Sequence, residues 1–254
     1  MSAKPDENPD GNKETDADQG KKVLDGAPGA VWFRTGKTSR PRPQLSHERI
    51  IATAVELLDR DGVRKLSMRR LAERLGAHAT SLYWHVATKD DVLDLALDAV
   101  FAELDLPERH GASWQDDIEA FMTGLRSVLL RHPWAGALAN SRPLMGPNAL
   151  RCSEFTYTAL TTGGFAGIHL SSAAATITHY VIGSASSEAV WRQRSDEAAT
   201  RSAVDAHIRD HIDEYPTLAG HFPLLEEDDW DAHFHRGMRL LLAGLASPEA
   251  QGRS

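Results

Sequence analysis

The stretch HATSLYWHV, residues 78–86, places an apolar pair inside a segment that is otherwise polar or aromatic. Leu82 and Val86 are four residues apart, so on a helix they share one buried face. At about 100° per residue, Trp84 then lies nearly opposite Leu82, and Tyr83 lies on a flank. Adjacent aromatic side chains outside a core are typical of a surface that another molecule covers.

The residues before this stretch complete a recognisable unit. A short helix is expected to begin at Ser67, with Leu71 and Leu75 on its apolar side and the small Ala72 where the helices cross. Gly76 can take the positive φ that the turn requires. Two short helices joined by such a turn predict a helix-turn-helix, whose second helix enters the major groove of DNA, about 12 Å wide.

DNA would then cover the two aromatic side chains. Tyr83 can donate its hydroxyl to a phosphate, and Trp84 can donate its indole N–H. Arg69 and Arg70 are candidates for contacts to base edges or phosphates, and Lys89 lies at a helix N-terminus that attracts phosphate. Any one of these could instead be an ordinary solvated side chain. Their joint spacing favours DNA binding.

Charge is unevenly distributed along the chain. Residues 34–90 carry twelve basic and six acidic side chains, a net charge of +6, whereas residues 1–33 carry −3 and residues 91–254 carry −11. A basic block between acidic ones indicates a module that binds a polyanion. The alternative is chance clustering on a solvated surface.

The segment before the helices has two parts. Residues 1–30 are rich in Asp, Gly, Pro and Lys and are expected to be disordered. The sequence VWFRTGKTSRPRP, residues 31–43, is not a phosphate-binding loop, because Val31 stands where that motif needs glycine. It reads either as a linker or as a basic arm along a DNA groove. The basic residues of this possible minor-groove arm are Arg34, Lys37, Arg40 and Arg42.

From residue 45 onward the periodicity predicts helices and no convincing strand, so the fold class is all-α. The expected organisation is a disordered tail with the arm (1–44), a three-helix head (45–92), a helical body (93–247) and a short tail (248–254). Thr88 with Asp91, and Ser113 with Asp116, predict capping boxes. Further helices are expected to run to His132, from Pro147 to Gly163, over 169–190 and over 226–246, with a loose connection at 191–202.

Composition excludes several classes. The chain has 254 residues, 41% hydrophobic and 25% charged, as in a globular protein. Its one cysteine, Cys152, rules out an intrachain disulfide and suits a reducing compartment. No apolar leader and no run of about 20 apolar residues occurs. We therefore expect a cytoplasmic protein that has no membrane partner and needs no cofactor or metal ion.

The body offers a candidate pocket and a candidate interface. Aromatic, apolar and a few polar side chains could line a ligand site, although for each residue taken singly ordinary core is the favoured reading. These candidates are Phe121, Leu125, Trp134, Leu138, Ser141, Phe155 and His179. The Ala/Ser/Gly-rich segment 171–187 and the apolar stripe 230–245 have the character of an interface between two subunits.

Three motifs carry a family resemblance: A-x-x-L-L-x-x-x-G at 54–62, L-A-x-x-L-G at 71–76 and S-L-Y-W-H-V-x-x-K at 81–89. With them, residues 48–97 resemble the DNA-binding head of the TetR family of transcriptional repressors, and the third motif is close to the tetracycline repressor branch. Weaker similarity continues through SWQDDI (113–118) and SRP (141–143), so the resemblance covers roughly residues 45–245.

The resemblance implies an Ω-shaped homodimer that binds a palindromic operator and is released by a small-molecule inducer. By this resemblance the operator-contact positions are Met68, Arg69, Ala79, Thr80, Ser81, Tyr83, Trp84, His85 and Lys89. Ala79 replaces a polar reading residue, so the operator differs from that of the tetracycline repressor. Glu103, Phe121 and Leu138 replace inducer-site residues, which favours an apolar, aromatic-lined pocket over a tetracycline–magnesium site.

Two other functions are open at this point. A metal-dependent enzyme could use His207 and His211, which are spaced i, i+4, or His233 and His235 beside Asp231. No HExxH or Gly-x-Ser-x-Gly motif supports catalysis, and we expect no enzyme. An architectural DNA-binding protein without a ligand is the second alternative, and its binding would depend steeply on salt with little sequence preference.

Overall fold

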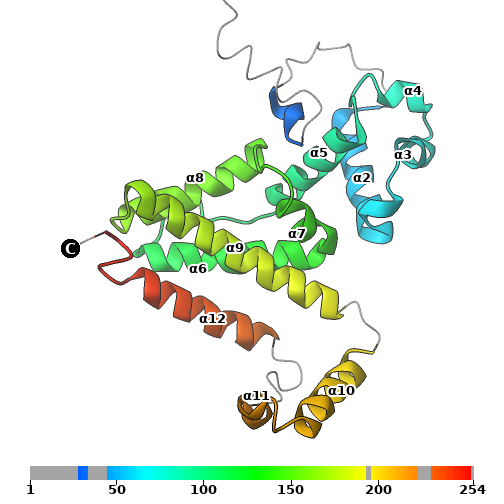
Figure 1. Ribbon diagram of the computed structural model, residues 1–254. Coiled ribbons are helices and arrows are strands. Elements are labelled where there is room, and N and C mark those ends of the chain that lie inside the picture. Colours follow the sequence, from blue (N-terminus) through cyan, green and yellow to red (C-terminus); the bar gives the residue numbers. More distant parts are fainter. Residues whose placement is uncertain (1–27, 34–44, 193–195, 222–229, 253–254) are drawn as a thin grey trace, which may run out of the picture.

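The computed structural model of the chain describes residues 28–33, 45–192, 196–221 and 230–252, and all regular structure in these ranges is helical (Figure 1). This confirms the predicted all-α fold class. The elements are η1 (Ala30–Phe33), α2 (His47–Asp61), η2 (Val63–Lys65), α3 (Met68–Leu75), α4 (Ala79–Leu82), α5 (Lys89–Ala102), α6 (Trp114–Arg131), α7 (Pro133–Ala139), α8 (Pro147–Thr162), α9 (Gly167–Arg192), α10 (Glu197–Asp210), α11 (Pro216–His221) and α12 (Trp230–Leu245).

The head consists of α2, η2, α3 and α4, closed by the start of α5. The core of the head contains fully buried apolar side chains such as Ile50, Leu71 and Leu82. Ser46 caps α2 by accepting a hydrogen bond from the Arg49 N–H. These short helices therefore depend on a shared core and on caps more than on their own length.

The body is built around α9, which packs against α6, α7 and α8 (Figure 1). Fully buried side chains such as Ile118, Leu125 and Ile177 fill the space between them. The last helix, α12, lies along α9 and α6. It is held there by Arg126, which donates to Glu188 on α9 (2.7 Å) and to Asp231 on α12 (2.7 Å).

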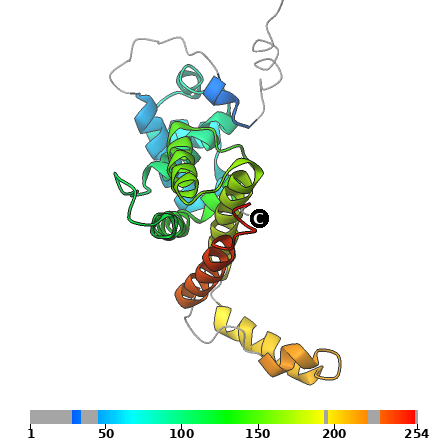
Figure 2. The ribbon, with the colours of Figure 1, turned by 90° about the vertical axis from the view of Figure 1, so that its left-hand side faces the viewer.

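Two helices project away from this body. α10 and α11 form a pair that reaches outward in both ribbon views (Figures 1 and 2), and within them Ile208 is the buried side chain. The expected loose connection over 191–202 is therefore wrong in part, because α9 extends to Arg192 and α10 begins at Glu197. Charged residues on solvated faces concealed the helical periodicity here. The predicted last helix begins at Trp230, and residues 226–229 lie outside the described residues.

The N-terminal segment also differs from expectation. Residues 28–33, predicted to belong to the tail and arm, form a turn and η1, and these pack on α5. Ala30 is 3% exposed. The predicted basic-arm residues lie outside the described residues: Arg34, Lys37, Arg40 and Arg42.

One helix joins head and body. α5 begins under the capping box of Thr88 and Asp91, which is present as predicted, and runs without interruption from the head into the body. It packs against α2 at one side and against α6, α7 and α8 at the other. The boundary placed at residues 92/93 therefore falls inside a continuous helix.

Candidate nucleic-acid interface

The helix-turn-helix is formed by α3 and α4. Ser67 accepts a hydrogen bond from the Arg70 N–H (3.2 Å) and starts α3. Gly76 ends α3 in the left-handed region, at φ 66° and ψ 31°, and its N–H bonds to the carbonyls of the last turn. No heavy atom lies within 4 Å of a Cβ built on Gly76, so backbone conformation and not space requires glycine here.

The second helix covers only part of the stretch HATSLYWHV. α4 covers Ala79–Leu82, and a turn follows, in which the His85 and Val86 N–H groups bond to the Leu82 carbonyl. The helical wheel nevertheless assigned the faces correctly, because Leu82 is 0% and Val86 3% exposed. Tyr83 is 53% and Trp84 82% exposed, so both aromatic side chains stand on the outer surface.

The predicted cations occupy different positions. The Arg69 side chain is 86% exposed and pairs with Glu73 at i, i+4 (2.8 Å), a surface ion pair of small energy that leaves Arg69 accessible. Arg70 instead joins α3 to the end of α2, donating to Asp61 (2.9 Å) and to the Lys65 carbonyl (3.0 Å). Lys89 donates from Nζ to the Val63 carbonyl (3.2 Å).

The remaining predicted contact residues surround the aromatic pair. Thr80 is exposed, while four others are half-buried at the edge of the head: Met68, Ala79, Ser81 and His85. Sequence reasoning did not select His78, an exposed residue at the N-cap of α4, or the exposed Arg64 and Lys65 of η2. The adjacent basic pair, two residues after Gly62, was the available signal for the last two.

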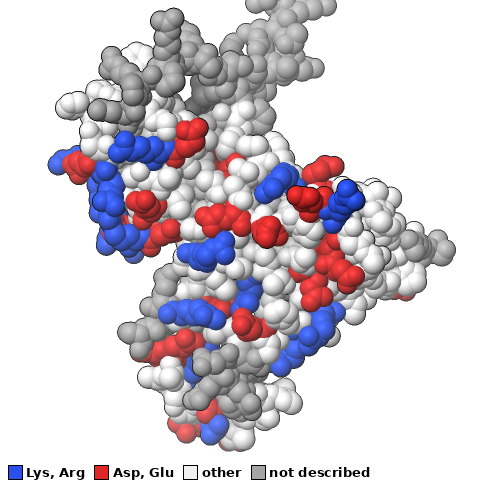
Figure 3. Space-filling model, turned by 180° about the vertical axis from the view of Figure 1, so that it is seen from behind, with Lys and Arg blue, Asp and Glu red and all other residues white. Residues whose placement is uncertain are grey.

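The basic character of the head is visible on its surface. In the view from behind, basic side chains gather on the outer edge of the head, whereas acidic and basic side chains mix over the body (Figure 3). The head thus combines exposed aromatic side chains, hydroxyls and cations on one short helix and its neighbours. Such a surface can bind phosphates and reach base edges.

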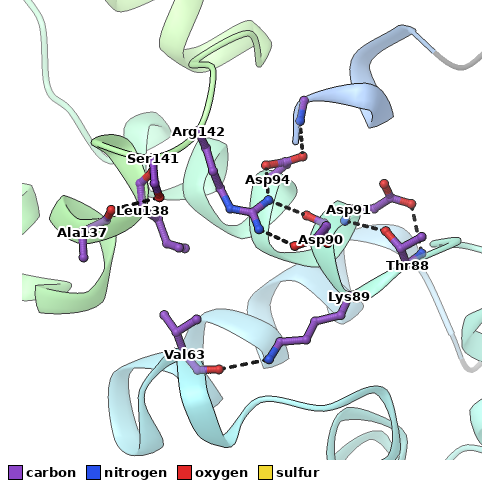
Figure 4. A network of polar contacts seen from close by, with 11 residues as sticks. Val63, Thr88, Lys89, Asp90, Asp91, Asp94, Ala137, Leu138, Ser141 and Arg142 are labelled. Carbon is purple, nitrogen blue, oxygen red and sulfur yellow. Dashed lines mark hydrogen bonds and ion pairs between the residues drawn. The ribbon is translucent and has the colours of Figure 1, made fainter. Parts of the chain in front are cut away.

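Behind this surface, α5 carries buried carboxylates with defined partners (Figure 4). Arg142 donates to Asp94 Oδ1 (2.7 Å) and also pairs with Asp90. Asp98 accepts hydrogen bonds from the N–H groups of Asn148 (3.1 Å) and Ala149 (2.9 Å) and so caps α8 from outside. These contacts fix α5 to the segment between α7 and α8.

A second set of contacts joins the head to α6 and α7. His132 lies between two carboxylates, 2.8 Å from Asp59 on α2 and 3.1 Å from Glu103 at the end of α5. Trp134 donates from its indole N–H to the same Asp59 (2.6 Å). Burial alone would raise the pKa of Glu103, but hydrogen bonds from His132 and Arg131 outweigh it and hold that pKa below its ordinary value.

The seven pocket candidates divide into two groups. Phe121, Leu125, Trp134, Leu138 and Phe155 are buried in the body core. Ser141 is exposed and donates to backbone carbonyls of α7, and His179 is exposed on α9. The pocket itself stays a prediction, because two hollows among the described residues are lined by none of the seven. One lies between α5 and the start of α8, and the other between α9 and α12.

The histidines of the alternative metal site are placed but not clustered with other ligands. The rings of His207 and His211 are 4.3 Å apart, and His211 Nδ1 lies 2.8 Å from the His207 carbonyl. His233 and His235 lie on α12, where His235 Nδ1 approaches the Asp231 carbonyl. Within the described ranges, no group of three or more metal-ligating side chains occurs. In the same ranges no helix is long and apolar enough to cross a bilayer.

Fold and surface together define a helix-turn-helix DNA-binding protein with a helical body. The profile of "Bacterial regulatory proteins, tetR family" matches residues 50–96, and that of "Tetracyclin repressor-like, C-terminal domain" matches residues 106–248. The chain therefore belongs to the TetR family of transcriptional regulators, as the sequence motifs indicated. It is a regulator family and not an enzyme family.

Individual relatives agree. An HTH-type transcriptional regulator of Saccharopolyspora erythraea is 61% identical over 88% of this chain and 94% of its own length. The HTH-type transcriptional repressor DrrR1 of Streptomyces coeruleorubidus is 32% identical over 88% and 86%. The TetR family protein ActR of Streptomyces coelicolor, solved in complex with actinorhodin, matches with a TM-score of 0.73 and 28% identity over 80% of this chain and 96% of that one.

Proposed function

We propose that this TetR-family regulator is a homodimeric cytoplasmic repressor that binds a palindromic operator and releases it when a small, largely apolar or aromatic inducer binds the body. The observation that carries the DNA-binding surface is the exposed pair Tyr83 and Trp84, which lie in the turn directly after α4, between the buried Leu82 and Val86. Arg69 extends the surface on the preceding helix.

Selection of bound sequences from random DNA tests the operator. We expect an inverted repeat whose half-sites are about 34 Å apart, one turn of DNA, because two identical heads must meet them. An architectural protein would instead yield no consensus and a steep salt dependence with little preference between sequences. Recovery of a single direct site without symmetry would contradict the dimeric arrangement.

Two body helices support the dimer. The outer face of α9 presents small side chains such as Ala175 and Gly183 together with Ile168 (74% exposed), and the neighbouring α12 presents Leu240 (76% exposed). Small residues let helices approach closely, and burying the apolar ones stabilises association. Sedimentation of Leu240→Glu should show monomers. Leu150→Glu, at a 48% exposed site on α8, is the matched control and should remain dimeric.

Body side chains support the proposed inducer class. By the resemblance, Glu103 stands at the position of an inducer-binding residue. It is already paired with His132 and Arg131, which argues against a drug–metal chelate. The buried Phe121, Trp134 and Phe155 favour an aromatic molecule, and the relative ActR was solved with actinorhodin. Actinorhodin and magnesium-tetracycline should be titrated against a labelled operator complex. Release by the second alone would contradict this assignment.

A further inference from the structure

The residues before the head form a docked turn on α5. The Gly29 N–H donates to Asp94 Oδ2 (2.7 Å, buried), and the Trp32 N–H closes the turn on the Gly29 carbonyl (3.2 Å). Gly29 has φ 85°, which favours glycine, and Ala30 is 3% exposed. We call residues 28–33 the clasp.

The clasp shares its acceptor with the loop that follows α7. Asp94 is 4% exposed, and its two oxygens have different partners: Oδ2 accepts from Gly29, and Oδ1 accepts from Arg142 (2.7 Å). A buried carboxylate is stabilised by the hydrogen bonds it accepts, so losing one partner weakens the whole arrangement. Asp94 therefore binds two segments that are far apart in the chain.

The clasp also contacts that loop directly. A Cβ built on Gly29 lies 3.5 Å from Pro143 Cβ, and Trp32 lines a small hollow together with Pro143, Met145 and Phe101. The loop in turn follows α7, whose neighbour His132 and own Trp134 contact Asp59 of the head. The clasp thus lies where α5 and this loop meet, and the loop leads to the α7 contacts with the head.

We propose that the clasp is an intramolecular brace. By docking on Asp94 and residues 141–146, it holds α5 in the orientation that lets the head bind DNA. The inference rests on the proposed operator binding for its affinity readout. Undocking of the clasp leaves Asp94 with one partner fewer and frees the loop from Trp32. α5 then becomes more mobile, and the DNA-binding orientation of the head is less populated.

Gly29→Pro tests the brace in the full-length protein, because proline removes the N–H and cannot adopt φ 85°. Gly20→Pro makes the same chemical change outside the described residues and is the control. We expect Gly29→Pro to weaken binding to the selected operator by about three- to thirtyfold at unchanged helix content. The slope of affinity against salt should not change, because no phosphate contact is removed. Unchanged affinity, or an equal loss in Gly20→Pro, would overturn the proposal.

Amide hydrogen exchange supplies a readout that does not need DNA. Gly29→Pro should speed exchange across α5 and residues 141–149 while leaving α9 unchanged, and Gly20→Pro should leave all three unchanged. If the wild-type protein binds no specific DNA, only the operator proposal fails. Hydrogen exchange then still tests whether the clasp holds α5. Exchange on α5 equal to that of the wild type would refute the clasp.

A crosslink provides the reverse experiment. The 3.5 Å separation of the two Cβ positions fits a disulfide, so Gly29→Cys with Pro143→Cys can lock the clasp. Both redox states carry the same backbone strain, so their comparison isolates the crosslink. The oxidised form should bind operator more tightly than the reduced form and exchange more slowly on α5. Identical behaviour of the two forms would count against the brace.

Discussion

Behind the outer surface of the head lies a joint, in which Arg142 contacts Asp90 and Asp94 of α5. The outer surface and this joint use the same residue types in opposite ways. On the outer surface, Arg69 and Trp84 are largely exposed, so their binding capacity is available to another molecule. In the joint, Arg142 is 9% exposed at its side chain and is fully engaged by carboxylates of α5. The difference teaches that exposure, and not charge or aromaticity, separates residues that recognise a partner from residues that hold the fold.

The comparison is sharpest for one substitution made at both places. Arg142→Met leaves the buried Asp94 without its cation, so we expect the free energy of unfolding in urea to fall by about 3–5 kcal/mol. Arg69→Met should change that free energy by less than about 0.5 kcal/mol and instead weaken operator binding. Equal stability of the two variants would break the distinction.

The aromatic pair should show the opposite profile to the joint. Tyr83→Ala and Trp84→Ala should each cost about 1–3 kcal/mol of operator binding, measured by fluorescence anisotropy, because they would remove the proposed phosphate and base contacts. Their unfolding free energies should stay within about 0.5 kcal/mol of the wild type, since neither side chain is in the core. A folded variant with unchanged operator affinity would refute the assignment of this surface.

The turn between the two short helices should tolerate little. Gly76→Ala must place an L-residue at φ 66°, which should destabilise the protein by about 1–2 kcal/mol in thermal unfolding. Gly220→Ala on α11, with open space around it and no positive φ, is the control and should be neutral or slightly stabilising. A neutral Gly76→Ala would mean that this turn is not constrained.

The contacts of His132 with Asp59 and Glu103 form a second joint between head and body, and they should affect the pH dependence of stability. The pKa of Glu103 is lower in the folded chain than its ordinary value of 4.5, so its contribution is present above that pH. This contribution is lost as the pH falls through the folded-state pKa. Urea midpoints between pH 6 and pH 3 should therefore fall less steeply in Glu103→Gln than in the wild type. A wild-type slope in this variant would contradict the role of the contact.

The smallest effect concerns the one thiol. Burial raises the pKa of Cys152 to about 11, so very little thiolate forms near neutral pH. A thiol reagent at pH 8 should leave the native protein unmodified and label it on unfolding. Rapid labelling of the native protein would show that α8 opens readily.

Much of the head followed from the sequence. Leu82 and Val86 fixed the inner face, Gly76 the turn, and Thr88 with Asp91 the cap, because each acts within a few residues of its partner. The length of α4 did not follow from the sequence. Leu82 and Val86 are buried in the same way whether the helix continues after Leu82 or a turn follows it. The DNA contact of Arg70 stays a prediction, but its ion pair with Asp61 could not be foreseen, because only the folded head brings the two within reach.

The joint could not be predicted in the same way. Asp94 and Asp98 find their partners about fifty residues away, so no local spacing reveals them. A signal was nevertheless present, because α5 carries apolar residues on every face, as in Val92, Leu93 and Leu95. A helix that is apolar all round is buried, and its carboxylates must then be paired. The docked turn before the head had no such signal.

The continuity of α5 has a consequence for building hybrid regulators. Because the single helix α5 packs against both the DNA-binding head and the body, the two parts cannot be exchanged as independent units at residue 92. A transplanted reader must bring α5 to Ala102, and its new host must offer an arginine equivalent to Arg142. Since α5 is shared, a head and a body taken from different regulators can be combined only where their α5 contacts are compatible.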